Sequence, residues 1–353
     1  MTKRIAVIAG DGIGVDVTRE ALKALDAARS VDGLDLEWVE MPYGAEHYLA
    51  TGVTMPEEQV AELRQDYAAI LVGALGDPRV PDMVHARDIL LGLRFKLDLY
   101  INFRPVRVLD PALCPLKGRG PDDLRFDVFR ENTEGLYVGI GGIFKKGTPD
   151  EVALQEDVNT RKGVERILRA AFSHARAEGH GRICMSDKSN ALRFGHDLWQ
   201  RAYEEVGADY PDIERTHLYV DALVMQMVKR PEQFRTIVTC NMFGDIVTDL
   251  GAQLQGGLGL AASGNIHPGR VSLFEPVHGS APKYAGKDVA NPLAAILSAA
   301  MLLAHLGERE SAGRLERAVL DAVRSGVTTR DLGGAHGTAA VGDHVASRVR
   351  ARI

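Results

Sequence analysis

Short runs of apolar and β-branched residues alternate along the chain with longer stretches whose apolar residues recur at helical spacing. The predicted elements are strands at 4–10, 68–74, 183–186, 236–240 and 271–276, and helices at 15–29, 161–179, 240–254 and 291–307. The last of these helices is apolar almost all round, which predicts that it is buried in a core. Alternation of this kind is typical of an α/β fold with helices on both faces of a sheet.

The length and composition narrow the class of protein. With 353 residues the chain suits two domains or one elaborate α/β unit, and it contains no apolar run long enough to cross a membrane. Its three cysteines, Cys114, Cys184 and Cys240, are far apart and form no C-x-x-C pair, which indicates neither a disulfide framework nor a zinc site. The net charge of −6 argues against a general nucleic-acid binder. We therefore expect a cytoplasmic protein that acts on small molecules, anionic ones included.

A glycine-rich turn, Gly10-Asp11-Gly12-Ile13-Gly14, follows the first predicted strand and precedes a helix. Its spacing is G-x-G-x-G and not the G-x-G-x-x-G of dinucleotide-binding Rossmann folds, and no acidic residue ends a clear second strand about 20 residues later. The pattern favours a tight strand-to-helix turn whose glycines permit close approach of another backbone. The turn is still a candidate to border a ligand.

Two carboxylates in the predicted helix 240–254 are the first candidates for metal ligands. Asp245 and Asp249 are four residues apart, hence on one helix face, where a divalent cation with oxygen ligands would relieve their repulsion. An ordinary polar helix face is the alternative, and the residues alone leave both open. Lys188, directly after the strand 183–186, is either a surface lysine or a catalytic base whose pKa is lowered by nearby cations.

Several arginines indicate recognition of an acid. Arg94, Arg104 and Arg107 lie in LRFKLDLYINFRPVR, and Arg130 and Tyr137 lie in RENTEGLYVG. The guanidinium fork matches a carboxylate with two hydrogen bonds, so converging arginines suit a di-acid substrate. Since Arg104 and Arg130 interrupt strand-like apolar runs, a purely solvated role is less favoured for them.

The chain resembles the metal-dependent β-decarboxylating dehydrogenases, the family of the isopropylmalate, isocitrate, homoisocitrate, tartrate and D-malate enzymes. The resemblance runs nearly end to end and rests on GDGIG, LRFKLDLYINFRPVR, RENTEGLYVG, DKSN, VDALVMQMV, NMFGDIVTDL, GGLGLAASGNI and FEPVHGSAPKYAGKDVANP. It implies a non-Rossmann α/β fold with two domains around a mixed sheet. A large cofactor-binding domain would comprise 1–101 and 257–353, and a smaller dimerisation and substrate domain 102–256.

The resemblance also implies roles for individual residues and a homodimer with shared active sites. Mg²⁺ or Mn²⁺ would be held by Asp245, Asp249 and Asp221 of the partner subunit. Lys188 of the partner subunit would be the general base, and Tyr137 would protonate the enol after CO₂ leaves. The substrate carboxylates would be bound by Arg94, Arg104 and Arg130.

Leu90 and Leu91 occupy the positions that face the variable group of the substrate in this family. Two leucines suit an isopropyl group and penalise a third carboxylate, which favours 3-isopropylmalate and hence leucine biosynthesis. Tartrate, D-malate and isocitrate enzymes are the alternatives. A regulatory subunit of a heteromeric dehydrogenase is the non-enzyme alternative, but such subunits typically lose catalytic residues that this chain retains.

The nicotinamide cofactor would be bound mainly by the loop around HGSAPKYAG. By resemblance the cofactor-binding residues are Ile13, Glu275, His278, Gly279, Ser280, Ala281, Lys283, Tyr284, Asn291 and Arg330. At the position of Lys283, relatives that use NAD usually carry Asp, whose carboxylate accepts hydrogen bonds from the ribose. A lysine can instead pair with a 2′-phosphate, with the Tyr284 hydroxyl as a second donor, so we expect use of NADP or of both nucleotides. We expect no nucleic-acid or membrane partner.

Overall fold

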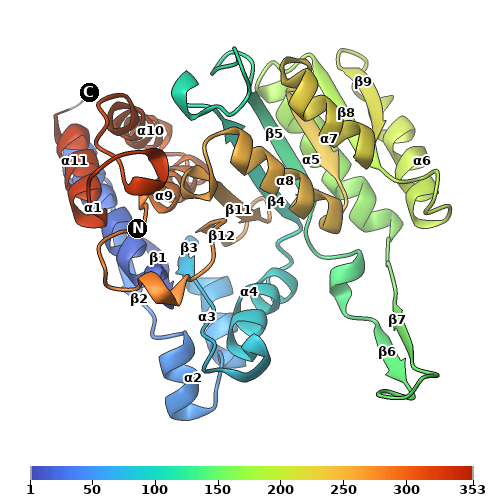
Figure 1. Cartoon of the computed structure of the whole chain (residues 1–353), viewed down its shortest axis with the longest axis horizontal. Coiled ribbons are helices and arrows are strands. Elements are labelled where there is room, and N and C mark those ends of the chain that lie inside the picture. Colours follow the sequence, from blue (N-terminus) through green and yellow to red (C-terminus); the bar gives the residue numbers. More distant parts are fainter. Residues whose placement is uncertain (1, 352–353) are drawn as a thin grey trace. The chain divides into compact units, whose positions relative to one another are not determined.

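The computed structural model describes residues 2–351 and divides into two compact units (Figure 1). The first unit is built from both ends of the chain, up to Leu99 and from Ala252, and includes Arg104–Leu124. The second unit comprises Tyr100–Phe103 and Arg125–Gly251. The segment 104–124 thus clusters with the first unit, whereas the family resemblance implies that it belongs to the smaller domain. Its Leu109 and Leu113 pack against the apolar core of the first unit.

Five strands of the first unit run in the order β2-β1-β3-β12-β11, with β11 antiparallel to β12 and the other pairs parallel. These strands are β1 (Lys3–Gly10), β2 (Leu36–Glu40), β3 (Ala69–Ala74), β11 (Ala262–Ile266) and β12 (Ser272–Pro276). The helices of this unit are α1 (Ile13–Asp32), α2 (Ala45–Thr51), α3 (Glu57–Asp66), α4 (Val84–Lys96), α9 (Leu293–His305), α10 (Arg309–Arg324) and α11 (Thr338–Arg350). The antiparallel pair makes the sheet mixed, as the family resemblance implies.

Alternating side chains of these strands supply two separate cores. Ile5 and Leu71 join the core formed with α1, α9, α10 and α11, while Ile8 and Ile70 join the core formed with α3 and α4. Successive residues of a strand point to opposite faces, so helices cover both sides of this sheet. Helix α9 is buried over most of its length, as its apolar sequence predicts.

The second unit contains four parallel strands in the order β5-β10-β8-β9. These are β5 (Arg125–Glu131), β8 (Arg182–Asp187), β9 (Glu214–Tyr219) and β10 (Thr236–Thr239), and β4 (Ile101–Arg107) passes from this unit into the first. The helices are α5 (Arg161–Ala177), α6 (Gly195–Gly207), α7 (Val220–Lys229) and α8 (Asn241–Leu254). Helix α5 packs on β5, β8 and β10 through a fully buried face that includes Ile167, Leu168 and Phe172.

A separate antiparallel hairpin, β6 (Gly141–Phe144) and β7 (Val152–Gln155), is exposed at every residue (Figure 1). Among residues 2–351, no helix combines the length and apolarity that spanning a bilayer would require.

Candidate functional site

The predicted metal and substrate residues of the second unit lie at or after the carboxyl ends of its parallel strands. In the strand register Thr239 of β10 pairs with Arg130 of β5 on one side and with Ser186 of β8 on the other. Because parallel strands end at one edge, Arg130, the start of α8 and the residues after β8 belong to the same edge of this sheet. Ligands of open α/β sheets bind at such edges.

Arg130 is the centre of a hydrogen-bonded group at this edge. Its side chain is buried, and its Nη1 donates to Oδ1 of Asp245 at 2.5 Å. Nε and Nη2 donate to Oδ1 of Asn241 at 3.0 and 2.7 Å. The Tyr137 hydroxyl donates to the other carboxylate oxygen of Asp245 at 3.0 Å. The structure therefore brings together three residues predicted from the sequence, Arg130, Tyr137 and Asp245, and fixes the orientation of each.

Helix α8 can lie against Arg130 because it carries a glycine at the point of closest approach. A Cβ at Gly244 would come within 2.4 Å of Cγ and 2.6 Å of Cβ of Arg130. Glycine in a helix interior costs about 1 kcal/mol relative to alanine. Here it lets the helix place Asp245 beside the guanidinium.

Asp249 lies one turn after Asp245 on α8 and is exposed, and Asp245 is partly exposed. Asp221, in the first turn of α7, accepts a hydrogen bond from Lys188 Nζ at 2.6 Å. The hydrogen bond from Lys188 lowers the pKa of the Asp221 carboxyl below its ordinary value. The carboxylates of Asp245, Asp249 and Asp221 offer the oxygen donors that Mg²⁺ and Mn²⁺ prefer.

In the first unit, Leu90, Leu91 and Arg94 share one face of α4 and are all partly exposed. Arg94 Nη2 donates to Oε1 of Glu275 at 3.0 Å. Glu275, which the resemblance assigns to the cofactor, thus also orients a predicted substrate residue. Arg104 is buried on β4.

The glycine-rich turn is a point of close backbone approach. A Cβ at Gly12 would lie 2.1 Å from the carbonyl oxygen of Ser280, and the Ile13 N–H donates to that same oxygen at 2.7 Å. Ser280 Oγ in turn donates to the Gly76 carbonyl at 2.5 Å. The turn and the loop 278–286 are thus joined directly, which is the structural role that the sequence pattern favours for these glycines.

The loop 278–286 presents Lys283 and Tyr284 outward. Beyond its junction at Ser280, the loop is held to α1 by Gly286, whose N–H donates to Oδ2 of Asp16 at 2.8 Å. Between these anchors both side chains are exposed, with Lys283 Nζ 4.7 Å from the centroid of the Tyr284 ring. Ala281 adopts a left-handed conformation (φ 37°) that turns the chain into this pair. A fixed loop with an exposed cation and hydroxyl suits a phosphorylated ligand.

Of the other predicted cofactor residues, His278 begins this loop, and Asn291 and Arg330 come after it in the chain. Burial lowers the pKa of His278, and its Nε2 has no hydrogen-bond partner among the described residues. Asn291 is buried and donates to Oδ2 of Asp331 at 2.9 Å, and the neighbouring Arg330 is exposed. An uncharged ring nitrogen that lacks a partner fits a polar ligand such as a nucleotide base or ribose.

Two important residues escape the sequence analysis. Asn241 carries no charge and sits inside a quoted motif without any periodic signal, yet it holds Arg130. Asp11 accepts from the N–H groups of Ala45 and Gly76 at 2.6 and 2.7 Å and contacts His85 Nε2 at 2.8 Å. The sequence shows Asp11 in the glycine-rich turn but does not predict its role, because its three partners come from distant segments.

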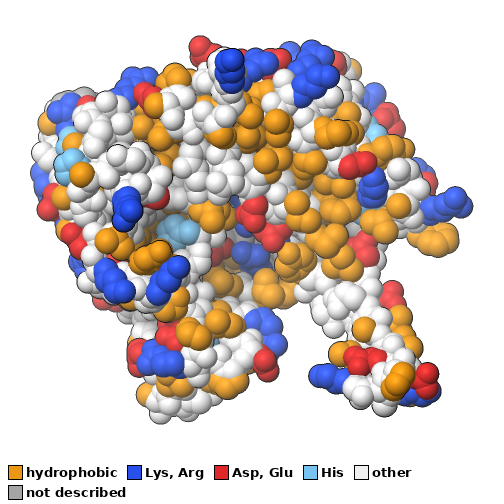
Figure 2. All heavy atoms as spheres, in the orientation of Figure 1, with side chains coloured by type: hydrophobic (Ala, Val, Ile, Leu, Met, Phe, Trp, Pro, Cys, Tyr) orange, Lys and Arg blue, Asp and Glu red, His pale blue; other side chains and the backbone are white. Residues whose placement is uncertain are grey.

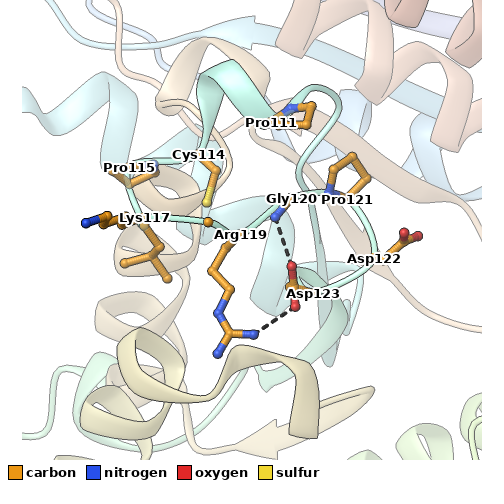
Figure 3. Close-up of a pocket in the computed structure, with 11 residues that line it drawn as sticks. Pro111, Cys114, Pro115, Lys117, Arg119, Gly120, Pro121, Asp122 and Asp123 are labelled. Atoms are coloured by element: carbon orange, nitrogen blue, oxygen red, sulfur yellow. Dashed lines mark hydrogen bonds and ion pairs between the residues drawn. The ribbon is translucent and has the colours of Figure 1, made fainter.

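A surface hollow of about 550 Å³ is formed by the loop between Pro111 and Asp123 (Figure 3). Arg119 Nη1 and the Gly120 N–H donate to the Asp123 carboxylate at 2.9 and 3.0 Å across it. It contains none of the predicted site residues.

Comparisons with known proteins find similarity to one enzyme family. A family model described as isocitrate/isopropylmalate dehydrogenase matches residues 4–345. The chain is 47% identical over 350 residues to the 3-isopropylmalate dehydrogenase of Thermobifida fusca, covering 99% of this chain and 98% of the relative. It is 48% identical over 353 residues to the enzyme of that name from Corynebacterium urealyticum, covering 99% and 100%. The crystal structure of isocitrate dehydrogenase from Methylococcus capsulatus superposes with a TM-score of 0.89 at 37% identity and 99% coverage of both chains.

Proposed function

Since the chain belongs to the isocitrate/isopropylmalate dehydrogenase family, we propose that it oxidatively decarboxylates 3-isopropylmalate with a nicotinamide nucleotide and a divalent cation. The observation that carries this proposal is the pair Leu90 and Leu91 on the same face of α4 as Arg94. An arginine selects a carboxylate, and two leucines beside it select an apolar substituent. The curated relatives that bear the isopropylmalate name support the same choice.

The residues of the second unit fit the metal. Asp245, Asp249 and Asp221 of the partner subunit would supply hard oxygen ligands, and Mg²⁺ or Mn²⁺ would act when bound as a Lewis acid on the substrate oxygen. The hydrogen bonds that Asp245 accepts from Arg130 and Tyr137 orient its carboxylate. Such support of a ligand is typical of metal sites.

The chain's own side chains carry out binding and proton movement. Arg94, Arg104 and Arg130 bind the two carboxylates of the substrate and align them. Lys188 of the partner subunit, as the neutral amine, accepts the proton of the substrate hydroxyl at Nζ, and Asp221 of the same subunit holds that nitrogen in position. The Tyr137 hydroxyl delivers a proton to the carbon that loses CO₂. Because Tyr137 already shares Asp245 with Arg130, its hydroxyl is held in one orientation for this transfer.

The residues of the first unit fit a nicotinamide nucleotide, which accepts a hydride from the substrate carbinol when bound. The outward-facing pair Lys283 and Tyr284 favours a ligand with a 2′-phosphate, and so supports NADP or dual use. No carboxylate at position 283 is available to accept ribose hydroxyl hydrogen bonds. The pKa of His278 is lowered and its Nε2 has no hydrogen-bond partner within residues 2–351, so this nitrogen is available to a polar group of the same ligand.

We also propose a homodimer. In the second unit, Met225 and Val228 on α7 and Ile246 on α8 are exposed, and Figure 2 shows apolar side chains gathered over these helices. The hairpin exposes Ile143, Phe144, Val152 and Leu154. Exposed clusters of apolar side chains are typical of protein–protein interfaces, and two copies of one chain offer matching clusters by symmetry.

A substrate panel crossed with both nucleotides tests the proposal. We expect nucleotide reduction with 3-isopropylmalate and Mn²⁺ at a kcat/KM well above those for D-malate, tartrate and isocitrate. A preference for isocitrate would contradict the substrate assignment and leave the reaction class intact. Absence of reduction with all four acids would contradict the enzyme proposal and favour a regulatory subunit.

A further inference from the structure

A second cluster of ionisable side chains lies at the opposite end of the same parallel strands. Asp127 is near the start of β5, three positions before Arg130, and its register partner is Thr236, the first residue of β10. His174 comes from the last turn of α5, and His180 follows that helix. The donor atoms of Asp127, His174 and His180 all lie within 4.8 Å of one another.

The end of α5 brings the two histidines together. Gly179 takes a left-handed conformation (φ 67°), its N–H donates to the Arg176 carbonyl, and the His180 N–H donates to the Ala175 carbonyl at 2.7 Å. This is the Schellman arrangement, which folds the chain back over the last helical turn. As a result the rings of His174 and His180 meet edge to face, with centroids 5.8 Å apart.

The surrounding residues fix the orientation of each donor. His174 Nε2 lies 2.8 Å from Oδ2 of Asp127, whose carboxylate is buried, and the rings of Phe103 and Phe129 pack against the imidazole. His180 Nδ1 lies 2.9 Å from the hydroxyl of Thr236. The Thr236 hydroxyl and the two phenylalanine rings are outer contacts of the kind that orient the histidine ligands of metal sites.

From this arrangement we infer that Asp127, His174 and His180 form a binding site for a transition-metal ion of the Zn²⁺ class. Two imidazoles and one carboxylate are a donor set for Zn²⁺ or Co²⁺ and not for Mg²⁺. Ligand atoms in a tetrahedral zinc site are about 3.3 Å apart. The donor atoms of Asp127, His174 and His180 lie within 4.8 Å of one another, so small side-chain movements would bring them to that spacing. Water would complete the coordination, since both histidines are partly exposed. The C-terminal end of α5 adds a favourable field for a cation.

An ordinary buried Asp–His pair is the simpler explanation, and the same unit contains one for comparison. Asp187 is as buried as Asp127 and lies 2.9 Å from His217, but its further side-chain neighbours include the Gln200 amide and the Ser189 hydroxyl. A buried carboxylate therefore needs no second imidazole to be satisfied. The second imidazole is what distinguishes the cluster at Asp127.

Cobalt titration of the full-length chain tests the site. We expect one equivalent of Co²⁺ to bind with the intense visible bands of a tetrahedral nitrogen–oxygen site, and to do so equally in an Asp245→Asn/Asp249→Asn background that removes the proposed catalytic metal ligands. The bands should disappear in His180→Gln, which leaves the bond between His174 and Asp127 in place. They should persist in His344→Gln, a matched control whose ring contacts Asp321 at 2.9 Å without a second imidazole.

Zinc-dependent stability gives a second readout that is independent of catalysis. Zn²⁺ should raise the Tm of the unmodified chain and of His344→Gln, and should not raise that of His180→Gln. Identical Co²⁺ spectra and Zn²⁺-induced Tm shifts in the unmodified chain and His180→Gln would overturn the inference. So would the lack of tetrahedral Co²⁺ bands in every variant. Neither result would bear on the proposed dehydrogenase activity.

Discussion

Asn241 holds Arg130 through a single oxygen that accepts hydrogen bonds from both Nε and Nη2, at 3.0 and 2.7 Å. The other end of the same amide donates to the Glu134 carbonyl at 3.0 Å. The amide therefore joins β5, α8 and the loop after β5, and leaves Nη1 of Arg130 to face Asp245. Arg130 is proposed to bind a substrate carboxylate, so Asn241 is a positioning residue for that contact.

Replacing Asn241 by alanine should raise KM for the acid more than it lowers kcat. Hydrogen bonds to a charged group are worth about 1.5–3 kcal/mol, so kcat/KM should fall about 10- to 100-fold. Steady-state kinetics with saturating nucleotide measure the change. Asn159→Ala is the control, because that amide accepts from the Trp199 indole at 2.8 Å and touches no proposed site residue. Equal effects of the two variants would contradict the positioning role.

The substitution Gly244→Ala tests a second contact of Arg130, its close approach to helix α8. Its new Cβ would lie 2.4 Å from Cγ of Arg130, so either α8 or the arginine must shift. We expect loss of both stability and activity, although alanine is intrinsically the better helix residue by about 1 kcal/mol. Gly313→Ala on α10 is the matched control: its Cβ would meet only the flexible end of Arg317, at 3.3 Å, and it should keep stability or gain it. Urea unfolding measures the stability of both variants, and steady-state kinetics measure their activity. A Gly244→Ala enzyme that is stabilised and fully active would show that α8 does not approach Arg130 this closely.

Much of this site could be anticipated from local pattern. Strands β1, β3, β8, β10 and β12 and helices α1, α5, α8 and α9 can be predicted because apolar periodicity is a local signal. Asp245 and Asp249 are conspicuous because four residues make about one helical turn. Asn241 was invisible because a neutral amide creates no pattern, and its role depends on Arg130 from another strand. Likewise the spacing of the glycines around Gly12 predicts that another backbone segment approaches closely, but only the fold shows that this segment contains Ser280. The segment 104–124 joins the first unit through contacts of Leu109 and Leu113, which no local composition marks.

Lys283→Asp should shift the preference from NADP toward NAD. The change removes a cation proposed to pair with the 2′-phosphate and supplies a carboxylate that accepts from ribose hydroxyls. A charge-assisted hydrogen bond of about 1.5–3 kcal/mol corresponds to a change of about 10- to 100-fold in kcat/KM for NADP. The ratio of kcat/KM values for the two nucleotides is the measurement. Lys287→Asp, an exposed lysine just beyond the Gly286 anchor, controls for net charge. An unchanged ratio in Lys283→Asp would refute the assignment.

Shared active sites predict complementation between two inactive variants. Tyr137→Phe and Lys188→Met should each abolish turnover, because one loses the proposed acid and the other the proposed base. In a hybrid dimer, Tyr137 of one subunit and Lys188 of the other would form one intact site. Unfolding and refolding an equal mixture should therefore recover roughly a quarter of the unmodified activity, the share expected for random pairing of subunits. Refolding each variant alone is the control. Failure to recover activity in a mixture shown to contain hybrid dimers would mean that each site is built within one chain.

The lowered pKa values of three histidines predict how the free energy of unfolding depends on pH. Burial lowers the pKa of His196, His278 and His305 from the ordinary value of 6.5, so each is neutral in the folded chain at a pH where the unfolded chain begins to bind a proton. Below pH 6.5 the unfolded state therefore binds more protons, and the free energy of unfolding falls with acidification until the folded-state pKa is reached. The slope approaches about 1.4 kcal/mol per pH unit for each such group.

His305 isolates one of these contributions, because it lies at the end of α9 against the Phe274 ring and is not among the proposed site residues. His305→Gln cannot take up this proton, so its stability should fall less steeply than that of the unmodified chain between pH 6.5 and 5.5. Above pH 6.5 the two curves should run parallel, since the histidine is neutral in both states there. Urea unfolding at several pH values measures the slopes. Equal slopes below pH 6.5 would show that His305 protonates as readily in the folded chain as in the unfolded one.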